Sequence, residues 1–374
     1  MLTSRSGMAQ HGPSVGASLS LFPVRAVWTL ALDNALVAPP GYSPSHVFFP
    51  IEGNRLVAYE LEHGRQTWIA SVRPMLEPVE GDGLLFVHEA GTVKAIRIND
   101  GSTAWEISDL PQLAVAPVWG DGRLILCTAS GEVLVLRALD GQLVWRQNLG
   151  SRAHAPPALA ANRAYVPLDD GRIVAVSVET GASLWAGRLP EPATALLADT
   201  DRLFAGSRDN FFYAIREEDG TIAWRWRTGA DVVGLPVVDD RNVYFVSMDN
   251  VLRALSRRSG VQQWVRLLSL RPTRGPLAIG RTLVVSGIAQ SLPAYNMSDG
   301  SPAGELPAAG ELAAAPAVVR NSPLGLPQVL VVTRDLARGA TATLFARQLD
   351  PPLSPFVPPP GAIEVTPPLG VPAE

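Results

Sequence analysis

Short runs of alternating apolar and polar residues, separated by turn residues, extend along most of the chain. In one stretch, RLILCTA leads through Ser130-Gly131 into EVLVLRA, which leads through Asp140-Gly141 into QLVWRQN. Alternation with turn signals about every 8 to 12 residues is typical of antiparallel strands, because successive side chains point to opposite faces. Residues 113–117, which end in a proline, predict a further innermost strand, so we expect units of four short strands.

The turns between these runs carry residues that adopt positive φ. Asp170-Gly171, Asp209-Asn210 and Asp249-Asn250 each separate two apolar runs. Gly and Asn after Asp favour tight hairpins, because both reach positive φ at low cost. Gly81-Asp82-Gly83 and Gly120-Asp121-Gly122 are therefore predicted to be hairpin turns and not phosphate-binding loops.

One phrase recurs seven times: a small residue, five residues, Gly, three residues, Trp. The glycines lie 37 to 40 residues apart, at Gly64, Gly101, Gly141, Gly181, Gly220, Gly260 and Gly300. The tryptophans are Trp68, Trp105, Trp145, Trp185, Trp224 and Trp264, and Gly304 takes this place in the seventh copy. The small residues are Ala58, Ala95, Ala175, Ala214, Ala254 and Ala294, with Val135 as the exception. A repeated four-stranded unit of about 40 residues is the period of a propeller blade.

The ends of the repeat region predict a closed ring. Trp28 lies 40 residues before Trp68, so the chain opens on the outer strand of an otherwise missing blade. After Gly304, strands are predicted at residues 312–319, 328–334 and 341–348, and no Trp strand follows. We therefore predict an all-β, eight-bladed β-propeller of four-stranded antiparallel blades, in which the N-terminal strand completes the last blade. Closure removes two exposed sheet edges.

The two ends differ from the repeat. Residues 1–23 and 351–374 are predicted to be disordered, the latter because prolines crowd it, and the propeller is placed at residues 24–350. The sequence contains no run of about 18 apolar residues, so no membrane-spanning helix is predicted. The apolar run at residues 19–24 is short and interrupted by Pro23, so no convincing signal peptide or lipobox is found. Either the protein is not exported by the usual route or its start lies upstream.

Composition excludes several classes of function. The 374 residues carry a net charge of −4, which offers no basic surface for nucleic acid. The single cysteine, Cys127, excludes an intramolecular disulfide, and its apolar neighbours predict a buried structural thiol. The five histidines share no metal-ligand spacing. The 33 glycines and 33 prolines match the many turns that eight blades require. Separately, we expect the protein to be a monomer.

The repeats resemble the PQQ-type propeller repeat, whose docking motif runs Ala-x-Asp-x-x-Thr-Gly-x-x-x-Trp. Thr180, Gly181 and Trp185 keep the second half of this motif, whereas its Asp is replaced in every copy. The resemblance covers about residues 24–350. The same repeat serves quinone-cofactor dehydrogenases, sensor or stalk domains, and the BamB family of outer-membrane assembly lipoproteins. Length and blade number are most similar to BamB, which implies a scaffold in the cell envelope or periplasm.

The repeat tryptophans have two interpretations: they could hold a flat cofactor or pack between neighbouring blades. Their strict register favours packing, in which Gly and Ala give the indole room. The docking set is thus Trp28 with the six repeat tryptophans and the seven repeat glycines. Trp119 and Trp226 are off this register, so they are candidates for contact with a partner.

A PQQ-dependent dehydrogenase of this family would need a base carboxylate, a calcium shell, an Arg near the quinone and often two vicinal cysteines. The paired carboxylates Asp169-Asp170, Glu217-Glu218 and Asp239-Asp240 fall at predicted hairpin turns, where Asp is favoured for backbone reasons. We therefore predict no catalytic, metal or cofactor-binding residue and no enzyme. PQQ with calcium, or a sensor domain, is the alternative.

Loops from the outer strand of one blade to the inner strand of the next are predicted to line one mouth of the ring. They carry Arg73, Asp109, Arg152, His154, Asp231, Arg271 and Arg274. Arginine is enriched at protein interfaces. The sequence therefore predicts a non-enzymatic scaffold that binds a protein partner through this rim, with a merely solvated rim as the alternative. In the BamB family, such loops contact the barrel subunit of the assembly machinery.

Overall fold

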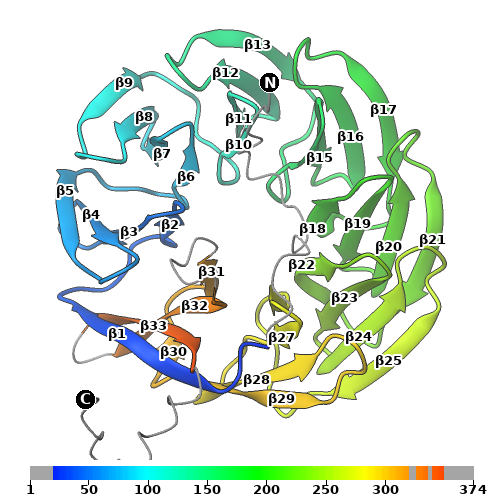
Figure 1. Ribbon diagram of the computed structural model, residues 1–374. Coiled ribbons are helices and arrows are strands. Elements are labelled where there is room, and N and C mark those ends of the chain that lie inside the picture. The colour runs from blue at the N-terminus through cyan, green and yellow to red at the C-terminus, as the bar shows by residue number, and fades with distance from the viewer. Residues whose placement is uncertain (1–19, 320–325, 336–338, 349–374) are drawn as a thin grey trace, which may run out of the picture.

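The computed structural model describes residues 20–319, 326–335 and 339–348, which form eight antiparallel sheets arranged in a ring (Figure 1). Seven sheets have four strands each, in chain order from the innermost to the outermost. The predicted all-β class and the eight-bladed propeller are confirmed. None of the described residues forms a helix that is long and apolar enough to cross a membrane.

Blades 1 to 7 follow one another along the chain. Blades 1 to 4 consist of β2 (Gly41–Tyr42), β3 (His46–Ile51), β4 (Arg55–Glu60) and β5 (Gln66–Ser71); β6 (Val79–Gly81), β7 (Leu84–Glu89), β8 (Thr92–Arg97) and β9 (Thr103–Ile107); β10 (Val118–Gly120), β11 (Arg123–Cys127), β12 (Glu132–Arg137) and β13 (Leu143–Asn148); and β14 (Ala158–Ala160), β15 (Arg163–Pro167), β16 (Arg172–Ser177) and β17 (Ser183–Arg188). Blades 5 to 7 consist of β18 (Ala193–Ala198), β19 (Arg202–Ser207), β20 (Phe211–Arg216) and β21 (Ile222–Arg227); β22 (Val232–Val238), β23 (Asn242–Ser247), β24 (Val251–Ser256) and β25 (Gln262–Leu267); and β26 (Leu277–Ile279), β27 (Thr282–Val284), β28 (Ser291–Asn296) and β29 (Pro302–Pro307).

Blade 8 joins the two ends of the described chain. Its outermost strand is β1 (Val24–Leu32), which pairs antiparallel with β33 (Gly339–Arg347), so the predicted closure is confirmed. The next strand inward is β32 (Gln328–Asp335). The predicted inner strand 312–319 is broken into β30 (Glu311–Leu312) and β31 (Ala317–Val319), which both pair with β32. Pro316 lies in the break and has no N–H to donate to a ladder.

The repeat tryptophans join each blade to the next. Each indole N–H donates to a backbone carbonyl 30 to 33 residues further along: Trp28 to Leu61, Trp68 to Ile98, Trp105 to Ala138, Trp145 to Val178, Trp185 to Glu217, Trp224 to Arg257 and Trp264 to Met297. The ring lies against the next repeat glycine so closely that a Cβ on Gly220 would be 2.4 Å from Cε3 of Trp185. The packing of the indole face on the next repeat glycine and the hydrogen bond of the indole N–H therefore both depend on the spacing of the repeats along the chain.

The seam between blades 7 and 8 has no tryptophan, because Gly304 stands in its place. Phe22 lies there instead, and a Cβ on Gly304 would be 2.6 Å from its ring. Leu21 is fully buried in the core between the two blades. The Arg347 guanidinium donates to the carbonyl oxygens of Ser20 and Phe22, at 2.5 and 3.0 Å. We call residues 20–23 the N-terminal strap.

The strap lies within the predicted disordered segment 1–23, so order begins at least four residues before the predicted start of the propeller. Residues 1–19 and the predicted disordered tail 351–374 lie outside the described residues.

The innermost strands of neighbouring blades contact one another, as β10 does with β6. In blade 3, the structure corrects two predictions. The inner strand β10 begins after Pro117, and of the predicted residues 113–117 only Leu113 and Ala114 pair with the end of β11, through the bridge to Thr128 and a hydrogen bond to Cys127. Trp119 is not a surface residue: it lies in β10 and is 3% exposed. Its indole covers Gly81 of blade 2, where a Cβ would be 2.1 Å from the ring. The aromatic side chain thus fills the space that the glycine leaves.

Replacing Trp68 by alanine should cost about 3–5 kcal/mol of unfolding free energy, because a nearly buried indole and its hydrogen bond are lost. The measurement is urea unfolding. Ile69→Ala is the matched control: Ile69 is the next residue and is 50% exposed, so a change of under about 1 kcal/mol is expected. Equal effects of the two substitutions would contradict the docking role of Trp68.

Replacing Phe22 by alanine should loosen the one seam without a tryptophan and cost about 1–3 kcal/mol. Hydrogen exchange should rise in β26–β29 and β32–β33, while blades 3 to 5 keep their protection, because local openings follow local contacts. A uniform rise around the whole ring would show that the strap has no special role at this seam.

Candidate partner-binding face

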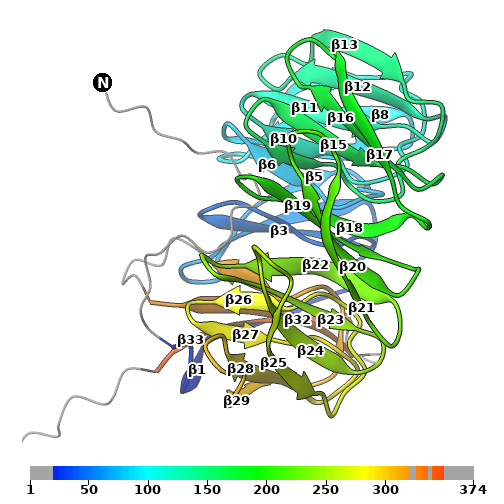
Figure 2. The same ribbon diagram turned by 90° about the vertical axis from the view of Figure 1, so that its right-hand side faces the viewer.

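One end of the ring gathers the loops between blades together with the hairpins between each blade's second and third strands. We call this end the mouth face. Figure 2 views the ring from its edge, where the outermost strands β17, β21 and β25 form the outer wall. The predicted rim residues all fall in mouth-face loops: Arg73, Asp109, Arg152, His154, Asp231, Arg271 and Arg274.

Two of the predicted rim residues are already paired within the chain. The Asp169 carboxylate, in the β15–β16 turn, accepts from Nε of Arg152 at 2.5 Å and contacts Nδ1 of His154 at 2.7 Å. Burial acts to raise the pKa of Asp169, but the bonds from His154 and Arg152 hold it below its ordinary value. The Arg152 charge is thus compensated locally.

Other mouth-face carboxylates hold the loops in place, which sequence reasoning missed. Asp249 accepts from Ser247 at 2.5 Å, from Arg253 at 2.7 Å and from the backbone N–H of Gly229 at 2.9 Å. Although burial opposes it, these bonds lower the pKa of Asp249. A carboxylate at one hairpin therefore fixes the loop that carries Asp231.

The carboxylates considered for a quinone site are engaged in the same way. Asp170 pairs with Arg172, and Asp239 accepts from Tyr244 and from backbone N–H groups. Glu217 contacts Arg163 and Tyr165 on the opposite end of the ring. These acids do not fit a shared calcium shell, because each is held by its own partners and they lie at both ends of the ring.

Arg271 and Arg274 differ from Arg152. In the described part of the chain, neither guanidinium has a carboxylate within ion-pair distance. Beside them lie two exposed apolar side chains, Leu235 (39% exposed) and Ile288 (74%). We call these four residues the blade 7 lip.

The lip is held together by backbone contact. β22 bulges between Val233 and Val237, and the bulge lies so near the loop before β26 that a Cβ on Gly275 would be 2.0 Å from the Leu235 carbonyl oxygen. Pro272 bridges to Gly287, which precedes Ile288. Two arginines and two apolar side chains are thus presented on one fixed surface.

Arg274 also acts on groups near blades 1 and 2. Burial raises the pKa of Glu77, which precedes β6, and the Arg274 charge opposes this. Burial and Glu77 raise the pKa of Tyr42 in β2, and Arg274 again opposes. The positive charge of Arg274 therefore acts beyond blade 8, on groups of blades 1 and 2.

Cys127, Trp226 and the group of Glu60, Glu62 and His63 could be functional by residue type, but their surroundings indicate structural roles. Cys127 is 2% exposed, and burial raises the pKa of its thiol to about 12. Trp226 is half-buried against the core between blades 5 and 6. Among the described residues, Glu60, Glu62 and His63 bring three potential metal-ligand atoms together, but Glu60 already bonds His63 and Arg65.

The sequence profile of the family described as "Outer membrane protein assembly factor BamB" matches residues 24–108, 89–200 and 190–333. The BamB of Yersinia pestis is 28% identical over 232 residues, which cover 57% of this chain and 58% of that protein. The chain therefore matches less than two thirds of the length of this curated relative.

Solved structures share the fold. BamB from Moraxella catarrhalis superimposes with a TM-score of 0.68 at 17% identity, covering 86% of this chain and 99% of that one. The quinohemoprotein alcohol dehydrogenase of Comamonas testosteroni gives 0.70 at 13% identity, covering 90% and 79%. At such identities these likenesses establish the architecture alone.

The buried His88 should make stability depend on pH. Its side chain is 3% exposed and neither ring nitrogen has a hydrogen-bond partner among the described residues. Desolvation lowers the pKa of His88, against the opposing charge of Glu89. The folded state thus takes up the proton less readily than the unfolded chain, so stability should fall as the pH drops below about 6.5.

In urea unfolding, His88→Leu should lose less stability than the wild type between about pH 7.5 and about pH 5.5. Parallel pH profiles for the two proteins would contradict this role of His88.

Proposed function

Because the chain belongs to the BamB family of outer-membrane protein assembly factors, we propose that it is a non-enzymatic scaffold for outer-membrane protein assembly in the bacterial cell envelope. The observation that carries this is the family match, which runs through overlapping segments from residue 24 to residue 333 and so spans nearly the whole ring. A scaffold needs a rigid body with an exposed docking surface, and the ring with its mouth face offers both.

The partner surface that the geometry favours is the blade 7 lip. Interface hot spots combine arginine with large apolar side chains, and both stand exposed here. Among the described residues, Arg271 and Arg274 have no carboxylate within ion-pair distance, whereas Arg152 is ion-paired with Asp169, which also contacts His154. The fitting partner is an acidic surface with an apolar centre, and we assign it to the barrel subunit of the assembly machinery, bound by a monomer of this chain.

No specific observation favours a quinoprotein. The likeness to the dehydrogenase is one of fold, and four of the candidate calcium ligands, Asp169, Asp170, Glu217 and Asp239, are bonded to partners of their own. We therefore propose that the chain works without PQQ or calcium.

Reversing two charges of the lip should weaken binding to the purified barrel subunit of the same bacterium. The variant is Arg271→Glu with Arg274→Glu, and the expected loss in affinity is about tenfold to a hundredfold, because hot-spot arginines lose their partners and repel an acidic surface. Biolayer interferometry on the full chain provides the measurement. Arg152→Glu should have a smaller effect, because Asp169 compensates that charge.

Arg241→Glu is the matched control, since Arg241 is exposed at the opposite end of the ring and should leave affinity unchanged. Equal weakening by Arg241→Glu would move the interface away from the lip. Absence of binding by the wild type would overturn the scaffold proposal, as would dye-linked alcohol oxidation after addition of PQQ and Ca²⁺.

A further inference from the structure

The blade 7 lip is a charged and apolar surface that the described residues leave without a counterpart. Arg271 and Arg274 are exposed, and no described carboxylate lies within ion-pair distance of either. Ile288, with 74% of its surface exposed, and Leu235, with 39%, stand beside them. The matching occupant is a segment that combines a carboxylate with apolar side chains, because such a contact pairs opposite charges and buries apolar area.

The chain itself carries one such segment, outside the described residues. Residues 349–374 contain three carboxylates and no Lys, Arg or His. The carboxylates are those of Asp350, Glu364 and Glu374. The other segments outside the described ranges contain no Asp or Glu: residues 1–19, 320–325 and 336–338. Among the parts of this chain that the structure does not describe, charge therefore singles out the C-terminal segment as the one that complements the lip.

Within this segment, Glu364 has the neighbours that match the lip. Ile363 and Val365 flank it, so one carboxylate stands between two branched apolar side chains. The lip presents the complementary set of two guanidinium groups and two apolar side chains. Prolines precede and follow, at residues 358–360 and 367–368. Because proline fixes φ in the free chain, docking of such a segment costs less conformational entropy than docking of a flexible peptide.

The length of the segment is sufficient to reach the lip. The described chain ends after β33 at Gln348, whose N–H donates to the Pro23 carbonyl at 2.7 Å, at the end of the ring opposite the mouth face. β33 runs back from the mouth face over nine residues, or about 30 Å. Residues 349–363 span about 45 Å at the rise of about 3.1 Å per residue of a proline-rich chain. The difference of about 15 Å is available to cross from blade 8 to the adjoining blade 7 (Figure 1).

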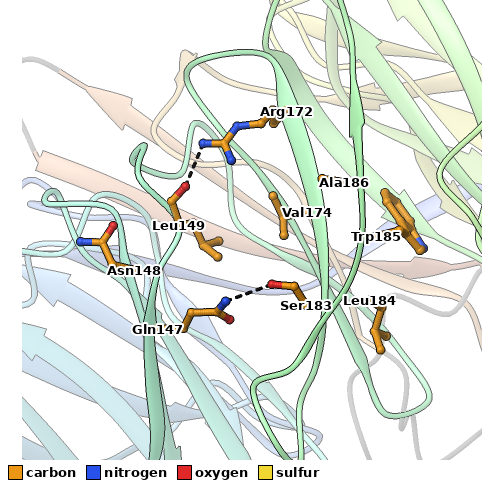
Figure 3. A pocket seen from close by; sticks show the side chains of 9 residues that line it. All are labelled: Gln147, Asn148, Leu149, Arg172, Val174, Ser183, Leu184, Trp185 and Ala186. Atoms are coloured by element: carbon orange, nitrogen blue, oxygen red, sulfur yellow. Dashed lines mark hydrogen bonds between the residues drawn. The ribbon is translucent and has the colours of Figure 1, made fainter.

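A hollow on the outer wall does not offer the same match (Figure 3). It has a volume of about 310 Å³ and lies between blades 3 and 4, across the ring from blade 8. Its one charged lining residue, Arg172, is already held by the Asp170 carboxylate at 2.7 Å and by the Leu149 carbonyl at 2.8 Å. The lip therefore fits an acidic segment better than this hollow does.

We propose that residues 361–366 of this chain dock on the blade 7 lip, with the Glu364 carboxylate between Arg271 and Arg274 and the flanking side chains on the apolar half of the lip. The contact is autoinhibitory, because the segment occupies the surface proposed for the barrel subunit, which must displace it. The inference rests on the proposed function for the identity of that partner. Because the segment is tethered, an effective concentration of about 1 mM lets even a weak contact compete.

Disulfide trapping in the full chain tests the contact without any partner. The variant carries Ile363→Cys with Ile288→Cys, and Cys127 does not interfere, because it is 2% exposed and burial raises the pKa of its thiol to about 12. The matched control pairs Ile363→Cys with Ile69→Cys, since Ile69 is 50% exposed on blade 1, the other neighbour of blade 8. Under mild oxidation followed by mass spectrometry, the disulfide to position 288 should form at least about tenfold faster than the disulfide to position 69. Equal rates would overturn the proposal.

Charge variants of the full chain separate this contact from the proposed function. Glu364→Arg should slow trapping at position 288 several-fold and raise affinity for the purified barrel subunit about threefold to tenfold, because the competing segment is repelled from the lip. Asp350→Arg is the matched control: it makes the same charge change two residues after Gln348, too near the ring's opposite end to reach the mouth face, and should change neither measurement. Preferred trapping at position 288 without any binding of the barrel subunit would support the contact and overturn the scaffold proposal. Equal trapping rates for Glu364→Arg and Asp350→Arg would show that Glu364 does not pair with the lip.

Discussion

The contact of an indole ring with a glycine of the next blade is the interaction on which the ring depends. It fixes both the residue under the indole and the position of the next blade. The indole face requires a residue without a side chain, and the indole N–H requires a carbonyl oxygen at hydrogen-bond distance. Seven such contacts in series join eight blades and leave one seam. There the chain uses Leu21 and Phe22 against Gly304, so ring closure depends on a segment that precedes the first strand.

Much of this architecture could be predicted because the docking residues recur at a fixed period. The spacing from Trp28 to Trp68, together with three strands and no Trp strand after Gly304, predicts the closure by the N-terminal strand that the structure shows. The strap could not be predicted, since Phe22 lies outside the repeat and is far in sequence from Gly304, the seventh-copy residue that it packs against. Trp119 is off the register of the repeat tryptophans, which favours a surface position, and only its contact with Gly81 reveals why it is buried.

Candidate site residues were harder to predict than strands. Sequence spacing placed the arginines in loops of one mouth, but it could not distinguish compensated charges from uncompensated ones. Asp169 neutralises Arg152 from a hairpin of the next blade, whereas the described residues provide no such partner for Arg271. The apolar half of the lip was missed as well, because Leu235 and Ile288 are ordinary residues in sequence and become a surface through the bulge in β22.

A repeat protein contains its own comparison, because eight blades place equivalent residues in equivalent surroundings. The docking positions join the blades, and where one of them varies, at Gly304, another segment of the chain fills the seam, so these positions carry little information about partners. Departures from the repeat are more informative. The lip arises where β22 bulges and the next loop meets it. This departure leaves the indole–glycine contacts intact, so the ring can vary its surface without losing the contacts that join its blades.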